Sequence, residues 1–182
     1  MKKIFAVLFM MVISTVAYSA VNIWHVKAFE QDGRTIDVKA FYDKKPGALY
    51  LVKALAEQDV EGHKILDIKV LDGNEDVYAH VKAINSQQDK PQDVKAIDDS
   101  DQKMHIKAVT SDGELLDIKA FATKNSSVRD VKAIDSEGNL LAIKAISPKG
   151  EVYDIKSLNL SAGELEFALG EQASTMPVKA VP

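Results

Sequence analysis

The hexapeptide Leu116-Asp117-Ile118-Lys119-Ala120-Phe121 is one copy of a short motif that recurs along the whole chain. We number motif positions from the lysine, so that Lys119 is position 0, Asp117 is −2 and Ala120 is +1. The lysines of the copies lie mostly twelve or thirteen residues apart, and they are Lys27, Lys39, Lys53, Lys69, Lys82, Lys95, Lys107, Lys119, Lys132, Lys144, Lys156 and Lys179. A period of this length leaves room for one short strand and one tight turn in each copy.

The motif alternates between apolar and polar positions. Position −1 is Val or Ile in every copy, position +1 is Ala except at Val70 and Ser157, and position +2 is always apolar. Position −2 is most often Asp. Alternation at period two with β-branched residues is typical of a strand that buries one face. The sequence therefore predicts an all-β domain of about twelve short strands.

Four linkers have the form x-x-Gly and end at Gly33, Gly113, Gly138 and Gly150. This form is typical of a three-residue hairpin loop, in which the glycine is left-handed. The loop sets a register in which position −2 of one strand faces position 0 of the next, and −3 faces +1. Asp then faces Lys along rows of alternating charge, and each such pair stabilises the sheet by ~0.2–1 kcal/mol.

The predicted fold is an antiparallel up-and-down meander that is strongly curled or closed as a barrel. A β-solenoid is the alternative, but it would stack the lysines on one another at spacings of about 4.8 Å. Val, Ile and Ala would not fill a twelve-stranded barrel, so we expect a cavity, a flattened sheet or a plug. A short helix predicted at 162–169 could be the plug, since a capping box precedes it and Gly170 follows it. The copy from Pro177 to Val181 is expected to pair with the first strand, near Trp24.

Residues 1–19 have the features of a secretory signal peptide. Lys2 and Lys3 precede an apolar stretch at 4–16, and Ala17 and Ser19 fit the small-residue cleavage site. The apolar stretch is short for a transmembrane helix. We therefore predict a single mature domain, residues 20–182, that is exported to the periplasm or secreted and has no transmembrane segment. The chain has no cysteine, so disulfides and thiolate chemistry are excluded.

The sequence offers little evidence for catalysis or for a cofactor. It contains no P-loop, GxSxG, HExxH or dinucleotide-binding motif, and the Asp/Lys pattern is spread over every strand. The net charge of −4 argues against a nucleic-acid partner. His25, His80 and His105 occupy position −2, where we expect them to face lysines rather than a metal. The acidic turns 72–76 and 98–101 do not match an EF-hand loop. We predict no catalytic, metal or cofactor site.

The favoured function is an exported, non-catalytic repeat protein with a structural, adhesive or protein-binding role. The alternatives are a carrier of a small ligand in a barrel cavity and, third, an enzyme. The predicted partner is a protein, a glycan or a small ligand, and its binding residues are expected where the motif lapses. The loops 57–63 and 159–176 break the motif, and a meander would place both at one end of the sheet. The candidate binding residues are Asp59, Glu61, His63, Glu164, Glu166, Phe167 and Trp24. A second candidate is an aromatic platform of Trp24, Tyr42, Tyr50 and Tyr78, for which core packing is the favoured interpretation.

Overall fold

The computed structural model describes residues 22–43, 45, 47–56, 65–74, 76–84, 90–124, 127–158 and 175–182. These residues form twelve strands and, within the same ranges, no helix; the predicted helix at 162–169 lies outside them. The strands are β1 (Asn22–Phe29), β2 (Thr35–Phe41), β3 (Tyr50–Ala56), β4 (Leu66–Leu71), β5 (Val77–Ile84), β6 (Gln92–Asp98), β7 (Lys103–Val109), β8 (Leu115–Ala122), β9 (Val128–Ile134), β10 (Leu140–Ile146), β11 (Val152–Leu158) and β12 (Thr175–Val181).

The alternation of the motif decides which face of each strand is buried. Positions −3, −1 and +1 point inward, and the alanines at +1 have no accessible surface. The lysines at 0 and their partners at −2 lie on the outer face, where they are partly exposed. All strand pairings are antiparallel, and every strand pairs with the next one in the chain. The predicted antiparallel meander is confirmed, and the solenoid is excluded.

Each strand pairs with three others rather than two. Along one side it has a single partner for most of its length, and along the other side its two halves pair with different strands. We call a group of three strands that pair with one another by halves a corner, and a long pairing between two corners an edge. The corners are β1–β2–β3, β4–β5–β12, β6–β7–β8 and β9–β10–β11.

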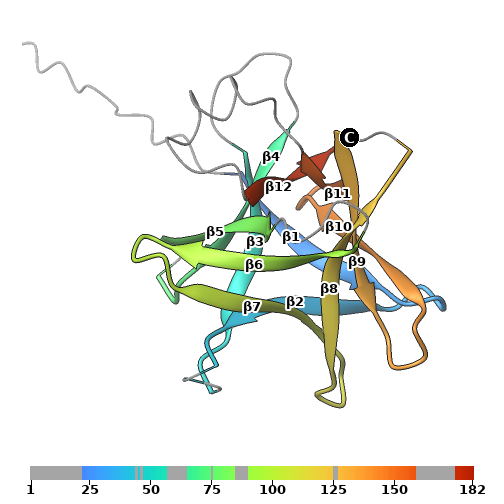
Figure 1. Cartoon of the computed structure of the whole chain (residues 1–182), viewed down its shortest axis with the longest axis horizontal. Coiled ribbons are helices and arrows are strands. Elements are labelled where there is room, and N and C mark those ends of the chain that lie inside the picture. Colours follow the sequence, from blue (N-terminus) through green and yellow to red (C-terminus); the bar gives the residue numbers. More distant parts are fainter. Residues whose placement is uncertain are drawn as a thin grey trace, which may run out of the picture.

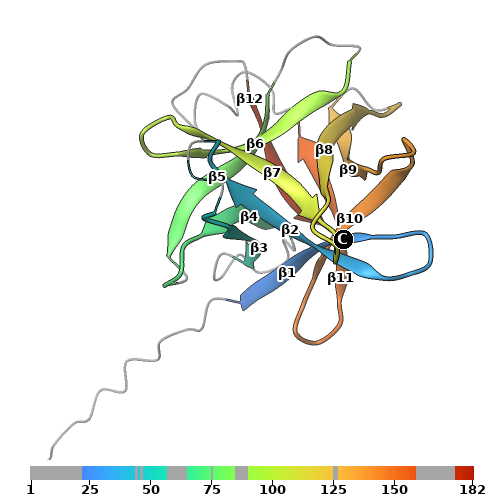
Figure 2. The ribbon, with the colours of Figure 1, turned by 90° about the horizontal axis from the view of Figure 1, so that it is seen from below.

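The edges complete a closed shell. They are β1–β10, β2–β7, β3–β4, β5–β6, β8–β9 and β11–β12, so that one edge joins each pair of corners. The connectivity is that of a tetrahedron with three strands at each vertex. Figures 1 and 2 show the result as strands that cross the molecule in several directions, without the common tilt of a barrel. Among the described strands no long side is left unpaired, although the sheet is not a barrel.

The predicted register is correct only within the corners. In the seven hairpins that stay in one corner, position 0 faces −2, as in Lys107 opposite Asp117. The four connections that cross an edge instead place lysine opposite lysine, as in Lys119 opposite Lys132. A three-residue loop dictates the register next to it, whereas a longer linker leaves the register free. The predicted continuous rows of charge are therefore wrong, and the charges form separate groups at the corners.

Two predictions about closure are also wrong. The last strand, β12, pairs with β11, β4 and β5 and not with β1. The interior that we expected to be too wide is filled, because inward-facing residues from all twelve strands form one core with exposures of 0–8%. Strands that radiate from four corners enclose less space than twelve parallel strands of a barrel, so Val, Ile and Ala fill it together with the larger residues at −3, such as Trp24, Met104 and Tyr153.

Size complementarity holds the corners together. At each half-pairing a residue at −3 faces a residue at +1, and a large side chain meets a small one, as in Leu116 opposite Ala108. The one reversal is itself compensated, because Val70 at +1 faces Ala79 at −3. The predicted −3 to +1 contact is thus confirmed, and it explains why the alanine of the motif is required.

Candidate functional site

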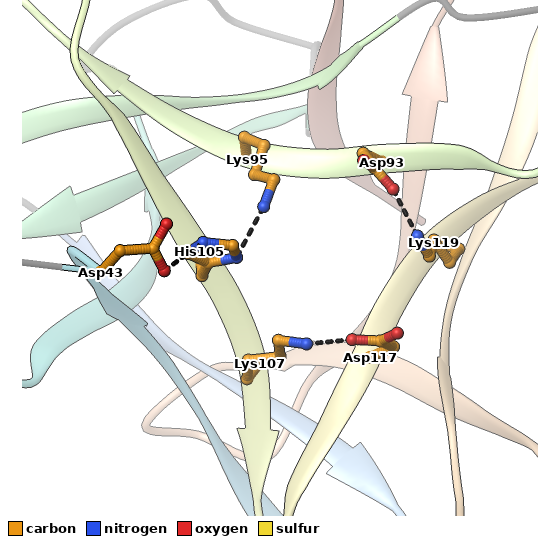
Figure 3. A network of polar contacts seen from close by, with 7 residues as sticks. All are labelled: Asp43, Asp93, Lys95, His105, Lys107, Asp117 and Lys119. Carbon is orange, nitrogen blue, oxygen red and sulfur yellow. Dashed lines mark hydrogen bonds and ion pairs between the residues drawn. The ribbon is translucent and has the colours of Figure 1, made fainter. Parts of the chain in front are cut away.

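The corner β6–β7–β8 carries a ring of six polar side chains on its outer face, held together in three pairs. Lys95 donates to His105 Nδ1 (2.6 Å), Lys107 is paired with Asp117, and Lys119 is paired with Asp93. Figure 3 shows that cations and acceptors alternate around the ring. The lysine partners hold the pKa of Asp93 and of Asp117 below the ordinary value, chiefly through these hydrogen bonds.

The other corners repeat this ring with gaps. At β9–β10–β11, Lys144 is paired with Asp154 and Lys156 with Asp130 (2.6 Å), but Lys132 faces Ala142. Histidine takes the acceptor position in two further corners, where Lys53 contacts His25 (2.8 Å) and Lys69 contacts His80 (2.6 Å). The ring recurs in all four corners, so it is part of the scaffold rather than a local site.

A tyrosine cluster departs from this repetition. Tyr42 follows β2, Tyr50 begins β3 and Tyr78 lies in β5. The rings of Tyr50 and Tyr78 are stacked with centroids 5.0 Å apart, and the ring of Tyr42 stands edge-on to both at 6.1 and 6.3 Å. The cluster borders a hollow of about 440 Å³ lined by Tyr42, Asp43, Lys45, Tyr78, Gln102 and Lys103, which we call the tyrosine hollow.

The wall of the tyrosine hollow is fixed by the turn between β6 and β7. Asp98 accepts hydrogen bonds from the backbone N–H groups of Ser100 and Gln102 (both 2.9 Å), and its second oxygen accepts from the Tyr42 hydroxyl. Burial and this hydrogen bond raise the pKa of Tyr42 well above its ordinary value. In the same turn Asp101 is left-handed (φ 58°), at the place where the repeat elsewhere has glycine. Asp tolerates this conformation better than most residues, so the turn keeps its shape.

Charged groups surround the aromatic wall. Asp43 accepts a hydrogen bond from His105 Nε2 (2.6 Å), which lowers the pKa of this carboxyl group, and 78% of its side chain is exposed. With Nε2–H donating to Asp43 and Nδ1 accepting from Lys95, both ring nitrogens of His105 are engaged. Lys45 and Lys103 are exposed, and among the described residues neither has an ion-pair partner. The hollow thus offers aromatic surface, hydrogen-bonding groups and two available ammonium groups.

Of the seven candidate residues that we predicted, the structure describes only Trp24. Asp59, Glu61, His63, Glu164, Glu166 and Phe167 lie outside the described residues. Trp24 lies in β1 rather than in a loop, is 4% exposed, and packs on Tyr153 with ring centroids 4.6 Å apart. The proposed platform of four aromatic residues is therefore split, since Trp24 belongs to the core and the three tyrosines gather at the surface.

The described residues that follow the two long loops meet β12 at different points. Along β12, Ala180 pairs with Leu66, close to where the segment 57–64 ends, whereas Thr175, where 159–174 ends, pairs with Ile84. These points are five residues apart along one strand, or about 16 Å. The prediction that both loops lie at one end of the sheet concerns residues that lie outside the described part of the chain.

Asp43, Lys45, Gln102 and Lys103 were not among our candidates. The available signals were the irregular loop at 43–47 and the turn at 98–102, whose third loop residue is Asp101 and not glycine. The loop at 43–47 and the turn at 98–102 line the same hollow, and the sequence did not reveal that they are adjacent in space.

The acidic turns have a structural explanation. Asp72 accepts from the N–H groups of Asn74 (2.8 Å) and Asp76 (3.1 Å), as Asp98 does in its own turn. Among the described residues, no group of three or more His, Asp or Glu side chains is arranged to hold a metal ion.

Comparisons with known proteins give a family and no function. In the part of the chain that the structure covers, no helix is long and apolar enough to cross a membrane. No curated protein and no solved structure matches the chain significantly. A family model described as a family of unknown function (DUF7486) matches residues 20–181. Since this match spans nearly the whole chain, the protein belongs to the DUF7486 family.

Proposed function

We propose that the protein is exported and acts as a non-catalytic binding protein, in an adhesive or protein-binding role, through the tyrosine hollow. The observation that carries this proposal is the departure of that hollow from the repeat. Three tyrosines from three strands or loops meet there, and the hydroxyl of one of them, Tyr42, donates a hydrogen bond to Asp98. Elsewhere on the described shell, the twelve copies serve strand pairing and packing.

The two alternatives receive less support. A carrier in the style of a β-barrel needs interior space, and the inward-facing side chains of the described strands fill the centre. An enzyme needs a group that can exchange a proton with a substrate. His105 is the natural candidate near the hollow, but both of its ring nitrogens are hydrogen-bonded to protein side chains.

Export is supported by the features of residues 1–19 and by a family match that begins at residue 20. We expect the full chain to be found outside the cytoplasm, and a chain without residues 2–19 to remain inside. Cell fractionation with immunodetection distinguishes these outcomes. Cytoplasmic retention of the full chain would refute export.

Binding is tested with the mature chain, residues 20–182, immobilised and exposed to envelope and medium extracts of the cells that make it. We expect a partner that is retained by the wild type and by Leu140→Ala, and lost with Tyr78→Ala. Leu140 is a matched control because it is apolar, exposed (53%) and in a different corner. A partner that is retained equally by all three proteins would remove the hollow from the proposal. A partner released with an altered mass would indicate an enzyme.

A further inference from the structure

We infer that the tyrosine hollow binds an acidic sugar, that is, a saccharide ring carrying a carboxylate or sulfate group. This inference rests on the proposed binding function and names the class of ligand that its site would take. The hollow, at about 440 Å³, falls within the range of ~300–1,000 Å³ of small-molecule sites. It is therefore large enough for a saccharide unit.

The aromatic wall suits the apolar face of a sugar ring. Tyr78 is 36% exposed, and its stacking on Tyr50 together with the Tyr42–Asp98 hydrogen bond holds the wall in one arrangement. A wall that is ordered before binding costs little entropy when a ligand is placed against it. Aromatic rings with a polar tip are suited to ligands that are apolar on one side and hydroxylated on the other.

The polar lining suits the hydroxyl groups of a sugar. The hydroxyls of Tyr42 and Tyr78 lie 3.3 Å apart, and the Gln102 amide lines the same hollow. Asp43 uses one carboxylate oxygen for His105, which leaves its other oxygen to accept from a ligand hydroxyl. His105 thus acts as a positioning residue for Asp43.

The charge of the lining selects an anion. Lys45 and Lys103 line the hollow, both are exposed, and neither has an ion-pair partner among the described residues. Among the described residues that line the hollow, Asp43 supplies the one carboxylate, so these residues together carry one surplus positive charge. The ring lysines of the corners differ, since most of them already face a carboxylate or a histidine. A charge-assisted hydrogen bond to an ammonium group is stronger than a neutral one, so the acid group supplies the selectivity.

The test is a calorimetric titration of the mature chain with three soluble oligosaccharides of matched length. One carries carboxylates (an oligogalacturonate), one carries sulfates (a sulfated galactan fragment) and one is neutral (a galactan fragment). We expect one or both acidic probes to bind at least tenfold more tightly than the neutral probe. Raising the salt from about 50 to 300 mM should weaken the acidic probes, because the contact is exposed and screened. Benzoate is the fourth probe, because it carries a carboxylate but has no sugar ring.

The variants place the binding in the hollow. We expect Lys103→Gln to lower the affinity for the acidic probe about tenfold, because one charge-assisted contact is lost. Lys149→Gln, which removes an exposed lysine of the β10–β11 turn, should leave affinity unchanged. Tyr78→Ala should abolish binding while Tyr78→Phe retains most of it, and circular dichroism checks the fold of each variant.

Four results would overturn the inference. They are equal affinity for acidic and neutral probes, no binding of any saccharide, equal loss with Lys103→Gln and Lys149→Gln, and benzoate binding as tightly as the best saccharide. If no saccharide binds but Tyr78→Ala still loses the partner from the extract, the proposed binding function stands and the acidic sugar is refuted. If no saccharide binds and Tyr78→Ala still retains the partner, both the acidic sugar and the proposed binding function are refuted.

Discussion

An alanine at +1 touches two larger neighbours, one across an edge and one within a corner. Ala108, for example, faces Val38 across the β2–β7 edge and Leu116 within its corner. It has no accessible surface, so no side chain larger than a methyl group fits without movement. Val70 is accommodated because its corner neighbour is Ala79 while its edge neighbour is still a valine, Val52.

The same swap, with a large residue at +1 and alanine at −3, can be introduced elsewhere in the shell. We expect Ala108→Val to destabilise the protein by ~1–3 kcal/mol through overpacking, and Leu116→Ala by ~2–5 kcal/mol through a cavity. The double variant should lose less than the sum by at least ~0.5 kcal/mol, because the valine fills the cavity. Urea denaturation measures all three. Pairing Ala108→Val with Leu141→Ala, in another corner, is the control and should be additive; additivity in the first pair would contradict the packing rule.

A single residue also decides whether a corner ring is complete. Lys132 faces Ala142 at −2, whereas the other two strands of this corner carry an aspartate at −2, namely Asp130 and Asp154. We expect Ala142→Asp to raise the free energy of unfolding by ~0.2–1 kcal/mol, as for an opposed pair on a sheet. Ala142→Asn has nearly the same shape without the charge and should give no gain. A benefit that persists at 1 M salt, where exposed pairs are screened, would contradict an ionic origin.

The elements owe their register to the turns. In the four x-x-Gly turns the glycine has φ between 85° and 89°, and its N–H donates to the carbonyl of the residue three positions earlier, for example Gly138 to Asp135 (3.0 Å). Asp135 also accepts from the N–H groups of Glu137 and Asn139. The turn is therefore held from both sides, and it aligns the strands that leave it through local contacts alone.

Gly138→Ala tests this role of the turn. A Cβ at this φ is strained even though nothing lies within 4 Å of it, so we expect a loss of about 1 kcal/mol. Gly73→Ala is the control, because Gly73 does not have a positive φ and its Cβ would also meet open space. We expect that variant to stay within about 0.5 kcal/mol of the wild type. Equal effects in thermal or urea denaturation would show that the conformation of Gly138 carries no cost.

At the scale of the whole molecule, the shell closes only when distant strands meet. Lys179 in β12 is paired with Asp67 in β4, which is 112 residues earlier. Removal of residues 175–182 would leave β4, β5 and β11 each without one of its three partners. We expect this truncated chain to unfold or self-associate, because exposed strand edges pair with other chains. Size-exclusion chromatography and circular dichroism measure this; removal of Pro182 alone is the control. A monomeric, native truncated chain would refute the closed shell.

The pH dependence of stability is also distributed over corners. Burial, and then the nearby lysines, lower the pKa of His25 and of His80 in the folded protein. The unfolded chain, with an ordinary pKa of about 6.5, therefore binds more protons as the pH falls through that value. The stability contributed by the neutral histidines is therefore present above about pH 6.5. It is lost as the pH falls toward the lower pKa of these histidines in the folded protein. The pKa values of ring carboxylates such as Asp37 and Asp117 are lowered as well, so these groups remain ionised in this window.

We therefore expect a lower melting temperature at pH 5 than at pH 7.5. The double variant His25→Asn, His80→Asn should show a smaller difference between the two pH values. A melting temperature that does not change between pH 7.5 and 5 in the wild type would contradict the assignment.

The sequence by itself determined the strands, their inner and outer faces and the register beside each tight turn. These features depend on side chains two residues apart and on loops of three residues, which act over a few ångströms. The long linkers do not constrain register, so the lysine-to-lysine edges could not be foreseen. Only the tertiary structure decided which half-strands meet, because sheet twist separates paired strands away from their turn and frees each far half for another partner. It also decided the tyrosine hollow, where Tyr42, Tyr78 and Lys103 come together from separate copies of the repeat.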